Sequence, residues 1–369
     1  MDVNSKKRLV GVIHHLTIGG AERMMVMLLN YFVTEGFEVH LIIFNHHGEL
    51  KEQLSQEIHV HNLAIPSVSK GMFKCLKEIH HINPHFVFSG IGHLNIALAP
   101  FIPMMKYLIP QSKWIARETN IVSLQNQASK YPKLFDWLYQ RFYKNYDVII
   151  AQSEDMKNDL EKNYFSSSKI VIVNNPVDIE RVEQLSQESC SYSFKEETIN
   201  LLTVSGLREE KRHDLMLHTL ALLPQQYHLT IVGGGEEEVS LKNLAKALNL
   251  TDRVTFEGNQ LNPYNYMKNA DLFLLTSQRE GFPNVLIEAN ALGIPIVAFA
   301  CPGGITEIIE EGVNGFYVPY NEIELLAKKI EKASSFSFKK ESIQKRTKNR
   351  YSKEVIFQKY KRIFTEERV

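Results

Sequence analysis

The sequence is poor in cysteine and has no long apolar run, and each absence excludes a class of protein. Its three cysteines, Cys75, Cys190 and Cys301, lie far apart and form no C-x-x-C pair. Neither a disulfide framework nor a zinc site is therefore indicated, and a reducing compartment is expected. A membrane-spanning helix needs about 20 apolar residues. The longest candidate, residues 96–105, is interrupted by two prolines, so we expect no membrane span.

The chain also has no excess of charge of either sign. Lys and Arg total 42 and Asp and Glu total 42, which argues against nucleic acid as a partner. The basic residues at positions 6–8 precede an apolar run that stops at His14, too soon for a signal peptide. Residues 339–350 hold six basic residues and one Glu. A solvated helix face is the favoured interpretation of this segment, and contact with an anionic surface is the alternative. We expect a cytoplasmic protein.

The length and the apolar pattern predict two α/β domains. A chain of 369 residues exceeds one ordinary core, and short β-branched runs alternate with amphipathic stretches, as in parallel sheets covered by helices. The expected domains are residues 1–185 and 194–349, with a C-terminal helix at about 350–369 packing back on the first. Ligands of such sheets bind at the carboxyl ends of the strands, so we expect the site in a cleft between the domains. The predicted strands are Leu9–His14, Val39–Phe44, Ile58–Leu63, Phe86–Ser89, Lys113–Ala116, Val148–Ala151, Ile170–Val173, Ile199–Ser205, Leu229–Val232, Val254–Phe256, Leu272–Leu275, Ile296–Phe299 and Phe316–Val318.

Two glutamates eight residues apart follow an apolar strand that ends at Leu275. A helix is expected to begin at Pro283, a residue suited to the first helical position, which places Glu280 in the loop and Glu288 in the helix. Eight helical residues span about 12 Å, whereas a retaining glycosidase pair needs about 5 Å. The spacing instead suits one carboxylate on a sugar and the other on a ribose, beside a diphosphate at the helix N-terminus.

With these residues the chain resembles glycosyltransferase family 4, retaining enzymes of the GT-B fold, in which two Rossmann-like domains face a cleft. The family signature is a Glu, seven residues and a second Glu, with Gly-Phe or Gly-Leu usually after the first. The resemblance covers most of the chain and includes four further segments, Ile18–Arg23, Asn175–Asp178, Pro302–Ile309 and Gly312–Gly315.

The resemblance implies a role for each matching residue. Glu280 would hold the hydroxyls of the donor sugar, Glu288 the ribose, and Lys211 the diphosphate. A cation suits that last position because the leaving diphosphate gains negative charge in the transition state. The nucleotide base is expected near Asn259. Backbone groups for donor binding are expected at Gly19, Gly20, Gly281, Phe282, Pro283 and Asn284.

One residue departs from the family pattern. The family usually has Gly-Arg-Leu where this chain has Ser205-Gly206-Leu207, so the expected arginine is missing at position 206. Arg208 lies two residues on, on the same side of an extended segment. It either replaces the missing arginine or is an ordinary surface residue, and both interpretations remain open.

Several histidines are further candidates for site residues. His93 follows a strand and two glycines, and it is either a functional histidine near the reacting sugar or a packed one. The pairs at 14–15 and 80–81 are not expected to chelate a metal, because adjacent side chains diverge. His46-His47 lies in a probable loop and is expected at the surface. No Asp-x-Asp motif occurs. We predict no obligatory metal and no cofactor other than the nucleotide sugar itself.

Two segments of the first half carry weaker signals. Arg117–Asn120 ends a strand and could contact the acceptor. Tyr131–Tyr146 mixes aromatic and basic residues, a composition found at membrane interfaces. Its residues Phe135, Leu138 and Phe142 follow helical spacing, so a core-facing stripe is favoured. Peripheral attachment to the cytoplasmic face of a membrane remains the alternative.

The predicted function is retaining transfer of a hexose or N-acetylhexosamine from a nucleoside-diphosphate sugar, with UDP the favoured nucleotide. The acceptor is a hydroxyl of a glycan or a lipid-linked saccharide. A nicotinamide dehydrogenase is disfavoured because no G-x-G-x-x-G follows the first strand. The alternative function is a non-catalytic protein of the same fold that binds a sugar nucleotide or glycan. Its support is the missing arginine at Gly206.

Overall fold

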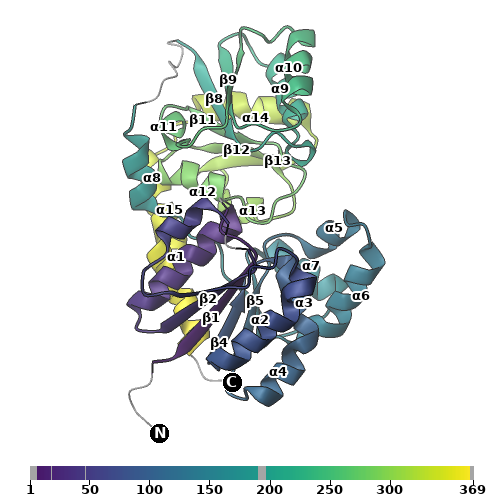
Figure 1. The fold of residues 1–369 in the computed structure, drawn as a ribbon. Helices are drawn as coiled ribbons and strands as arrows, with labels where there is room; N and C mark the ends of the chain where they lie inside the picture. The colour runs from purple at the N-terminus through teal and green to yellow at the C-terminus, as the bar shows by residue number, and fades with distance from the viewer. Residues whose placement is uncertain (1–5, 18, 46, 190–196, 366–369) are drawn as a thin grey trace. The chain divides into compact units, whose positions relative to one another are not determined.

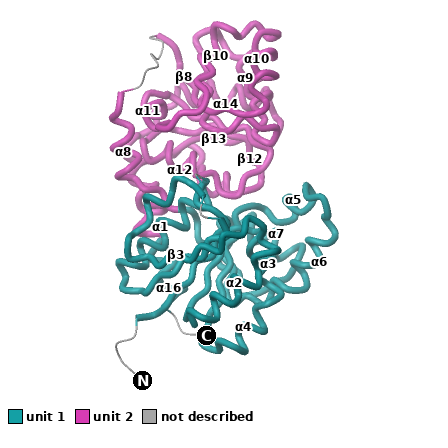
Figure 2. Tube along the Cα trace, viewed as in Figure 1, with its two compact units in different colours: residues 1–175, 357–369 teal, residues 176–356 magenta. Residues whose placement is uncertain are grey.

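The computed structural model describes residues 6–17, 19–45, 47–189 and 197–365. The chain forms two compact units (Figure 2). Unit 1 comprises residues 1–175 and 357–369, and unit 2 comprises residues 176–356. Three residues named above, Ile18, His46 and Cys190, lie outside the described residues.

Unit 1 contains a seven-stranded parallel sheet in the order β3-β2-β1-β4-β5-β6-β7 (Figure 1). The direction in which successive strands are added reverses at β1. Val10 of β1 pairs with His40 of β2 on one side and with Val87 of β4 on the other. The strands are β1 (Arg8–Ile13), β2 (Glu38–Ile43), β3 (His59–Asn62), β4 (Phe86–Ser89), β5 (Lys113–Arg117), β6 (Val148–Ala151) and β7 (Ile170–Ile172).

Helices pack on both faces of this sheet, because its strands bury side chains on both sides. The α-helices are α1 (Gly20–Thr34), α2 (Val68–Ile82), α3 (Gly92–Leu98), α4 (Ile102–Leu108), α5 (Val122–Gln127), α6 (Pro132–Phe142), α7 (Glu154–Asn163) and α16 (Lys353–Thr365), which enters unit 1 at Phe357. Short 3-10 helices are η1 (Glu49–Gln53), η2 (Ala99–Phe101) and η3 (Tyr143–Asn145). Gly36 follows α1 with φ of 82° and donates its N–H to the Val33 carbonyl, which ends the helix.

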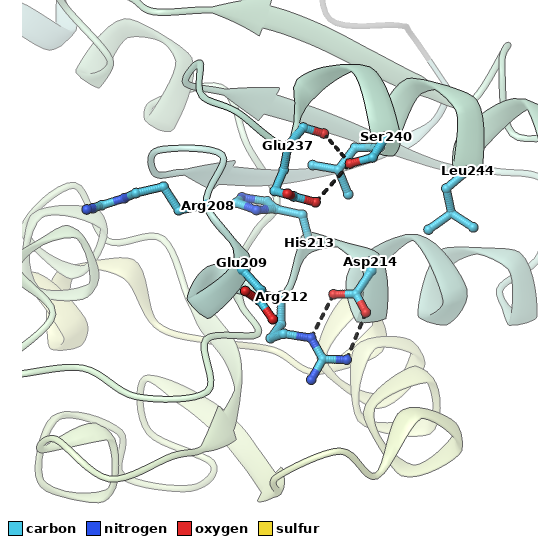
Figure 3. Close-up of a pocket in the computed structure, with 9 residues that line it drawn as sticks. Arg208, Glu209, Arg212, His213, Asp214, Glu237, Ser240 and Leu244 are labelled. Carbon is cyan, nitrogen blue, oxygen red and sulfur yellow. Dashed lines mark hydrogen bonds and ion pairs between the residues drawn. The ribbon is translucent and has the colours of Figure 1, made fainter. Parts of the chain in front are cut away.

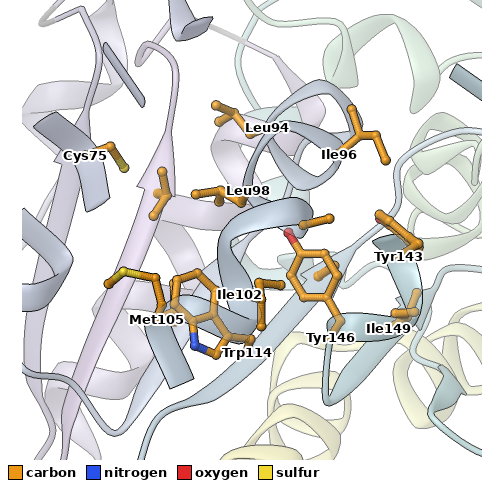
Figure 4. Packing of buried hydrophobic residues seen from close by; sticks show 14 of the residues in the cluster. Cys75, Leu94, Ile96, Leu98, Ile102, Met105, Trp114, Tyr143, Tyr146 and Ile149 are labelled. Atoms are coloured by element: carbon orange, nitrogen blue, oxygen red, sulfur yellow. The ribbon is translucent and has the colours of Figure 1, made fainter. Parts of the chain in front are cut away.

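The core on one face of the sheet unites residues of α2, α3, α4 and α6 with the strands (Figure 4). Trp114 and Tyr146 are fully buried there, and both satisfy their polar atoms. The Trp114 indole donates to the Ser112 hydroxyl at 3.0 Å, and the Tyr146 hydroxyl donates to the Asn95 carbonyl at 2.7 Å. Burial of each such side chain contributes about 2 kcal/mol without the cost of an unpaired polar group.

Aromatic residues of α16 pack against α1 and β4. The Phe364 ring centroid lies 4.6 Å from that of Phe32 and 5.4 Å from that of Phe86. Tyr360 is also fully buried. The last described helix of the chain therefore supplies core residues to the unit that contains the first strand.

Unit 2 repeats this architecture with a six-stranded parallel sheet in the order β10-β9-β8-β11-β12-β13. Its strands are β8 (Ile199–Val204), β9 (Tyr227–Val232), β10 (Val254–Gly258), β11 (Leu272–Leu275), β12 (Ile296–Ala300) and β13 (Gly315–Pro319). Its helices are α8 (Ile179–Ser186), η4 (Glu209–Lys211), α9 (His213–Leu222), α10 (Glu238–Ala247), α11 (Tyr264–Met267), α12 (Asn284–Ala291), α13 (Ile305–Ile308), α14 (Ile323–Ser335) and α15 (Lys340–Tyr351). Alternate residues of its strands belong to two different core clusters, one on each face of the sheet.

The predicted fold class is confirmed, and all predicted strands are present with ends shifted by at most two residues. The first predicted domain ended at residue 185, whereas the units divide between Asn175 and Pro176. The difference arises because Val182 of α8 packs in the core of unit 2. Pro283, the predicted first residue of the next helix, is the N-cap of α12, so the helix begins one residue later than predicted, at Asn284. Among the described residues, no helix has the length and apolar character needed to cross a membrane.

Candidate active site

Two loops of unit 2 lie side by side because of the strand order. β8 and β11 are neighbours in the sheet although β9 and β10 separate them in the sequence, so the loops that follow β8 and β11 leave the same edge. Parallel sheets bind ligands at such a change of strand order. The loop after β8 carries Lys211, and the loop after β11 carries Glu280.

Lys211 and Glu280 form an ion pair across these loops. The Lys211 Nζ donates to the Glu280 Oε1 at 2.7 Å, although 69 residues separate the two in the sequence. Only 16% of the lysine side chain and 11% of the glutamate side chain are exposed. Water and salt screen such a pair less than a surface pair, so the attraction holds both side chains in place.

Backbone contacts keep the two loops together. The Thr276 hydroxyl lies 3.2 Å from the Lys211 carbonyl and 3.0 Å from the Arg212 carbonyl, and it donates to them. The Gln278 N–H donates to the Glu210 carbonyl at 2.9 Å. Since these bonds join both loops through main-chain atoms, Lys211 is held opposite the end of β11.

A third loop supports Glu280. The Glu280 N–H donates to the Pro302 carbonyl at 3.0 Å. The next residue, Gly303, has φ of 124°, and a Cβ atom there would lie 2.1 Å from the Glu280 carbonyl oxygen. Only glycine fits both the backbone conformation and the space. The segment 302–309, noted in the sequence for its family resemblance, thus sets the backbone position of Glu280.

A cavity of about 480 Å³ adjoins η4 (Figure 3). Arg212 lies at its wall with φ of 51°, and its Nε and Nη2 atoms donate to Asp214 at 2.9 and 2.8 Å. Burial alone would raise the pKa of Asp214, but the hydrogen bonds and charge of Arg212 outweigh it, so the pKa lies below its ordinary value. The Arg212 side chain is therefore held by Asp214 in the first turn of α9 and by the Tyr320 hydroxyl, which accepts its Nη1 at 2.8 Å. The other lining residues are Arg208, Glu209, His213, Glu237, Ser240, Leu241 and Leu244.

His213 anchors the start of α9 beneath this loop. Its Nε2 lies 2.9 Å from the Ser205 hydroxyl. Burial lowers the pKa of His213 to about 4, and the positive charge of Lys211 adds to the effect. His213 is therefore neutral at pH 7 and packs against the site without adding charge to it.

The second glutamate lies on the helix that follows Glu280. Glu288 is half-buried on α12, and the Tyr264 hydroxyl donates to its Oε1 at 3.2 Å. The linking residues Gly281, Phe282 and Pro283 are buried. The Phe282 ring packs in the core of unit 2, and the predicted backbone contacts of this segment to the donor stay predictions.

In unit 1 the equivalent loops follow β1 and β4, the neighbours at its change of strand order. Gly19 is the N-cap of α1, Gly20 begins it, and the exposed His93 lies in the first turn of α3. The His14 and His93 ring centroids are 5.7 Å apart, so these two loops also meet. The pKa of His93 is lowered by partial burial and by the charges of His14 and His15.

The sequence did not reveal that His14 is a neighbour of His93. We expected the side chains of His14 and His15 to diverge, but their ring centroids lie 5.0 Å apart. The His14 Nε2 contacts the Pro66 carbonyl at 2.6 Å. The expectation assumed an extended strand, whereas β1 ends at Ile13 and alternation of side chains ends with it. A histidine directly after a strand was the available signal.

The segment 117–120 is largely unavailable to an acceptor. Arg117 and Glu118 are buried, with 1% and 0% of the residue exposed. The Glu118 Oε1 accepts the Asn95 amide at 3.0 Å and the Tyr143 hydroxyl, and its Oε2 has no partner in the described residues. Burial raises the pKa of Glu118 to about 7. Of this segment, Asn120 is exposed.

Comparison with known families decides the class of protein. The model of "Glycosyl transferases group 1" matches residues 187–350, and that of "Glycosyltransferase Family 4" matches residues 18–181. Together they cover most of both units. The chain belongs to the family 4 glycosyltransferases. It is a glycosyltransferase of the GT-B type that acts in glycan biosynthesis.

Relatives of this glycosyltransferase include two bacterial glycosyltransferases. It is 29% identical over 327 residues to the N-acetylgalactosamine-N,N'-diacetylbacillosaminyl-diphospho-undecaprenol 4-alpha-N-acetylgalactosaminyltransferase of Campylobacter jejuni, covering 83% of this chain and 84% of that one. It is 24% identical to the capsular polysaccharide biosynthesis glycosyltransferase CapM of Staphylococcus aureus, covering 96% of each. The structure of HepE from Anabaena in complex with UDP matches 97% of this chain and 99% of its own, with a TM-score of 0.77 and 20% identity, and supports the fold.

Arg208 lies beside Gly206, the residue that departs from the family pattern. A Cβ atom at Gly206 of this glycosyltransferase would lie 3.5 Å from the Arg208 Nε and 3.9 Å from its Nη2. The Arg208 guanidinium therefore folds back over Gly206 and occupies the space beside it. Its side chain is 58% exposed, and its Nε lies 3.4 Å from the Glu210 Oε1.

Asn259 has a defined structural contact. Its Oδ1 accepts the N–H of Gly234 at 2.8 Å, which joins the loop after β10 to the loop after β9. Its predicted contact to the nucleotide base stays a prediction. Among the described residues of this glycosyltransferase, no three His, Cys, Asp or Glu side chains form a group that could hold a metal ion.

Proposed function

We propose that the glycosyltransferase moves a hexose or N-acetylhexosamine from a nucleoside-diphosphate sugar to a hydroxyl of a glycan or lipid-linked saccharide, with retention of configuration. The observation that carries the proposal is the ion pair of Lys211 and Glu280 at the change of strand order in unit 2. The pair places a cation that can bind a diphosphate beside a carboxylate that can bind sugar hydroxyls. Because both side chains are partly buried, their electrostatic interactions with a ligand are stronger than they would be at the surface.

In the proposed mechanism the donor enters between these two charges. Glu280 accepts hydrogen bonds from the sugar hydroxyls, and Lys211 turns toward the diphosphate, whose charge grows as the glycosidic bond to phosphate breaks. Arg208, folded over Gly206, supplies a second cation. Glu288, held by Tyr264, accepts hydrogen bonds from the ribose.

Retention is proposed to follow from attack on the same face of the sugar. The acceptor oxygen forms its bond to the anomeric carbon as the bond to the phosphate oxygen breaks, and the acceptor proton passes to that phosphate oxygen. No covalent intermediate on the protein is needed. His93 is proposed to lie near the reacting sugar in a neutral form, consistent with its lowered pKa. The reaction is proposed to need no metal and no cofactor.

Names of relatives guide the choice of substrates. A UDP complex of HepE favours UDP as the nucleotide, and the polyprenyl-diphosphate saccharide in the name of the Campylobacter relative favours a lipid-linked acceptor. The relatives thus narrow the panel of donors and acceptors to be tested.

The test is release of nucleoside diphosphate from a panel of nucleotide sugars, with and without EDTA. We expect one donor to be turned over in EDTA, and Glu280→Ala to lose nearly all of that turnover. Glu331→Ala, which removes an exposed carboxylate of the same unit, is the matched control. Normal turnover by Glu280→Ala would refute the assigned role. If no donor is turned over, tight donor binding would indicate a missing acceptor, whereas no donor binding would favour the non-catalytic alternative.

A further inference from the structure

Exposed apolar side chains are concentrated on three helices of unit 1. In the described part of the chain, more than half of the large apolar side chains that are exposed belong to α2, α4, α6 and the N-cap residue of α6. Isolated exposed apolar residues are ordinary, but a concentration of them marks an interaction surface. These residues are Phe73 (75% exposed), Met104 (48%), Tyr107 (85%), Leu108 (46%), Tyr131 (55%), Leu134 (51%) and Trp137 (53%).

The three helices cover the same face of the unit 1 sheet, because the opposite sides of α2, α4 and α6 all contribute to one core cluster. Neighbouring contacts join them. The Phe73 ring of α2 lies 6.0 Å from that of Phe101, just before α4. Lys106 of α4 donates to the Asn145 carbonyl at 3.0 Å and to Asp147 at 2.7 Å, shortly after α6. The exposed sides of α2, α4 and α6 therefore point away from this face of the sheet. Together these exposed sides are called the outer face.

The outer face is positively charged although the whole chain is balanced. Of the ten lysines and arginines in residues 68–146, seven are exposed, whereas none of the three carboxylates of this range is exposed. Each carboxylate is engaged by its own unit: Glu118 is buried, Asp136 accepts the Tyr164 hydroxyl at 2.7 Å, and Glu78 contacts His61 at 2.9 Å. Among the described residues, the exposed basic residues of this segment form no ion pair, and Lys74 donates to the Leu63 carbonyl at 2.8 Å. They include Lys70, Lys74, Lys77, Lys130, Lys133, Arg141 and Lys144.

On α6 the two interpretations given to the sequence both apply, on opposite sides. Phe135, Leu138 and Phe142 pack against the core, as the favoured interpretation predicted. Leu134 and Trp137 project from the exposed side, which also carries basic residues. A helix with one core-facing side and one aromatic and basic side can pack on its sheet and meet a second apolar environment at once.

We propose that the outer face docks on the surface of an anionic lipid bilayer. Lysine and arginine side chains would meet lipid phosphates, and Trp137, Tyr107 and their neighbours would enter the interfacial layer, where aromatic residues are favoured. A second copy of this chain is a poor occupant, because a two-fold interface would place the same positive charge on both sides. The basic helix α15 lacks exposed large apolar residues in its described range and does not offer this combination.

Tryptophan fluorescence tests the proposal directly. The chain has two tryptophans, of which Trp114 is fully buried and Trp137 is 53% exposed. We expect vesicles of phosphatidylcholine mixed with phosphatidylglycerol to shift the emission to shorter wavelength and shield it from acrylamide. Trp137→Phe should abolish this change, and high salt should reverse it. No change with anionic vesicles, or an equal change with pure phosphatidylcholine, would overturn the proposal.

Charge and apolar contacts are separated by matched variants in vesicle sedimentation. Lys133→Glu with Lys144→Glu should weaken binding by at least roughly 30-fold, from about a fivefold effect for each basic residue near an anionic surface. Lys246→Glu with Lys328→Glu makes the same charge change on exposed lysines of unit 2 and should bind as the wild type does. Equal binding by both double variants would overturn the proposal.

The apolar contact is tested by Leu134→Glu in the same sedimentation assay. Its control is Val239→Glu, because Val239 is an apolar residue of unit 2 that is 71% exposed. Only Leu134→Glu should lose vesicle binding, and equal effects of the two would overturn the assignment of the outer face. Sedimentation without lipid tests whether the outer face instead binds a second copy of the chain. If Leu134→Glu abolished a dimer but kept vesicle binding, the proposal of membrane docking would be overturned. The proposal concerns where the enzyme works, so it can fail or hold independently of the proposed transfer reaction.

Discussion

Glu118→Gln should make unit 1 more stable at alkaline pH. Glu118 has no exposed surface, and its carboxylate accepts hydrogen bonds from Asn95 and Tyr143 at one oxygen only. Glutamine keeps the shape and the accepting oxygen but cannot ionise. The variant therefore removes the cost of burying a charge while leaving most of the packing intact.

The sign and size of the effect follow from the pKa. Burial raises the pKa of Glu118 from 4.5 to about 7, so between these values the folded protein binds a proton that the unfolded chain has released. Wild-type stability must then fall as pH rises from 4.5 to 7. At about 1.4 kcal/mol per pH unit, the full loss is about 3 kcal/mol. Glu118→Gln should show no such loss, so its advantage over the wild type grows by up to about 3 kcal/mol between pH 4.5 and 8.

Tryptophan fluorescence during urea unfolding is the suitable assay, because both tryptophans, Trp114 and Trp137, belong to unit 1. The signal reports the unit that contains Glu118 and is blind to unfolding of unit 2. Glu57→Gln, at an exposed carboxylate of the same unit, is the control and should track the wild type. A difference between Glu118→Gln and the wild type that does not change with pH would refute the reasoning. It would mean that the folded protein carries Glu118 as a carboxylate with an ordinary pKa.

Two substitutions in unit 2 test the architecture of the donor site. Tyr264→Phe removes the hydrogen bond to Glu288, so KM for the donor should rise roughly 2- to 10-fold with kcat unchanged in steady-state assays; a fall in kcat alone would contradict this. Gly303→Ala places a Cβ 2.1 Å from the Glu280 carbonyl and should cost more than about tenfold in transfer while circular dichroism stays normal. Gly312→Ala, at φ of 76° but with no contact closer than 3.8 Å, is its control and should keep full turnover.

Much of the donor site could be predicted because its residues follow strands. Lys211 and Glu280 lie in the segments that follow two apolar strands, and a parallel sheet brings such segments to one edge whatever their distance in the sequence. The direct contact between their side chains could not be predicted. It depends on the hydrogen bonds of Thr276 and Gln278 to the other loop, and those bonds leave no pattern in the sequence.

The burial of Glu118 was the main feature that the sequence did not reveal. A charged pair after a strand is usually exposed, so Arg117 and Glu118 were interpreted as acceptor contacts. Their burial arises from polar partners supplied by distant segments: Asn95 from α3, Tyr143 from η3, and Asn175, which accepts the Arg117 Nη2 at 2.5 Å. Periodicity in one segment cannot report partners that belong to others.

The return of α16 to unit 1 has a consequence for the order in which the protein folds during synthesis. Unit 2 is one continuous stretch of chain, residues 176–356, whereas unit 1 needs residues made before and after it. The ring contacts of Phe32 and Phe86 with Phe364 cannot form until Phe364 has been made. The same holds for the hydrogen bond from the Lys113 ammonium to the Ile363 carbonyl, 250 residues later. Contacts so distant in sequence form late. The half that is translated first is therefore the half that is completed last, and until then its aromatic residues need protection from aggregation.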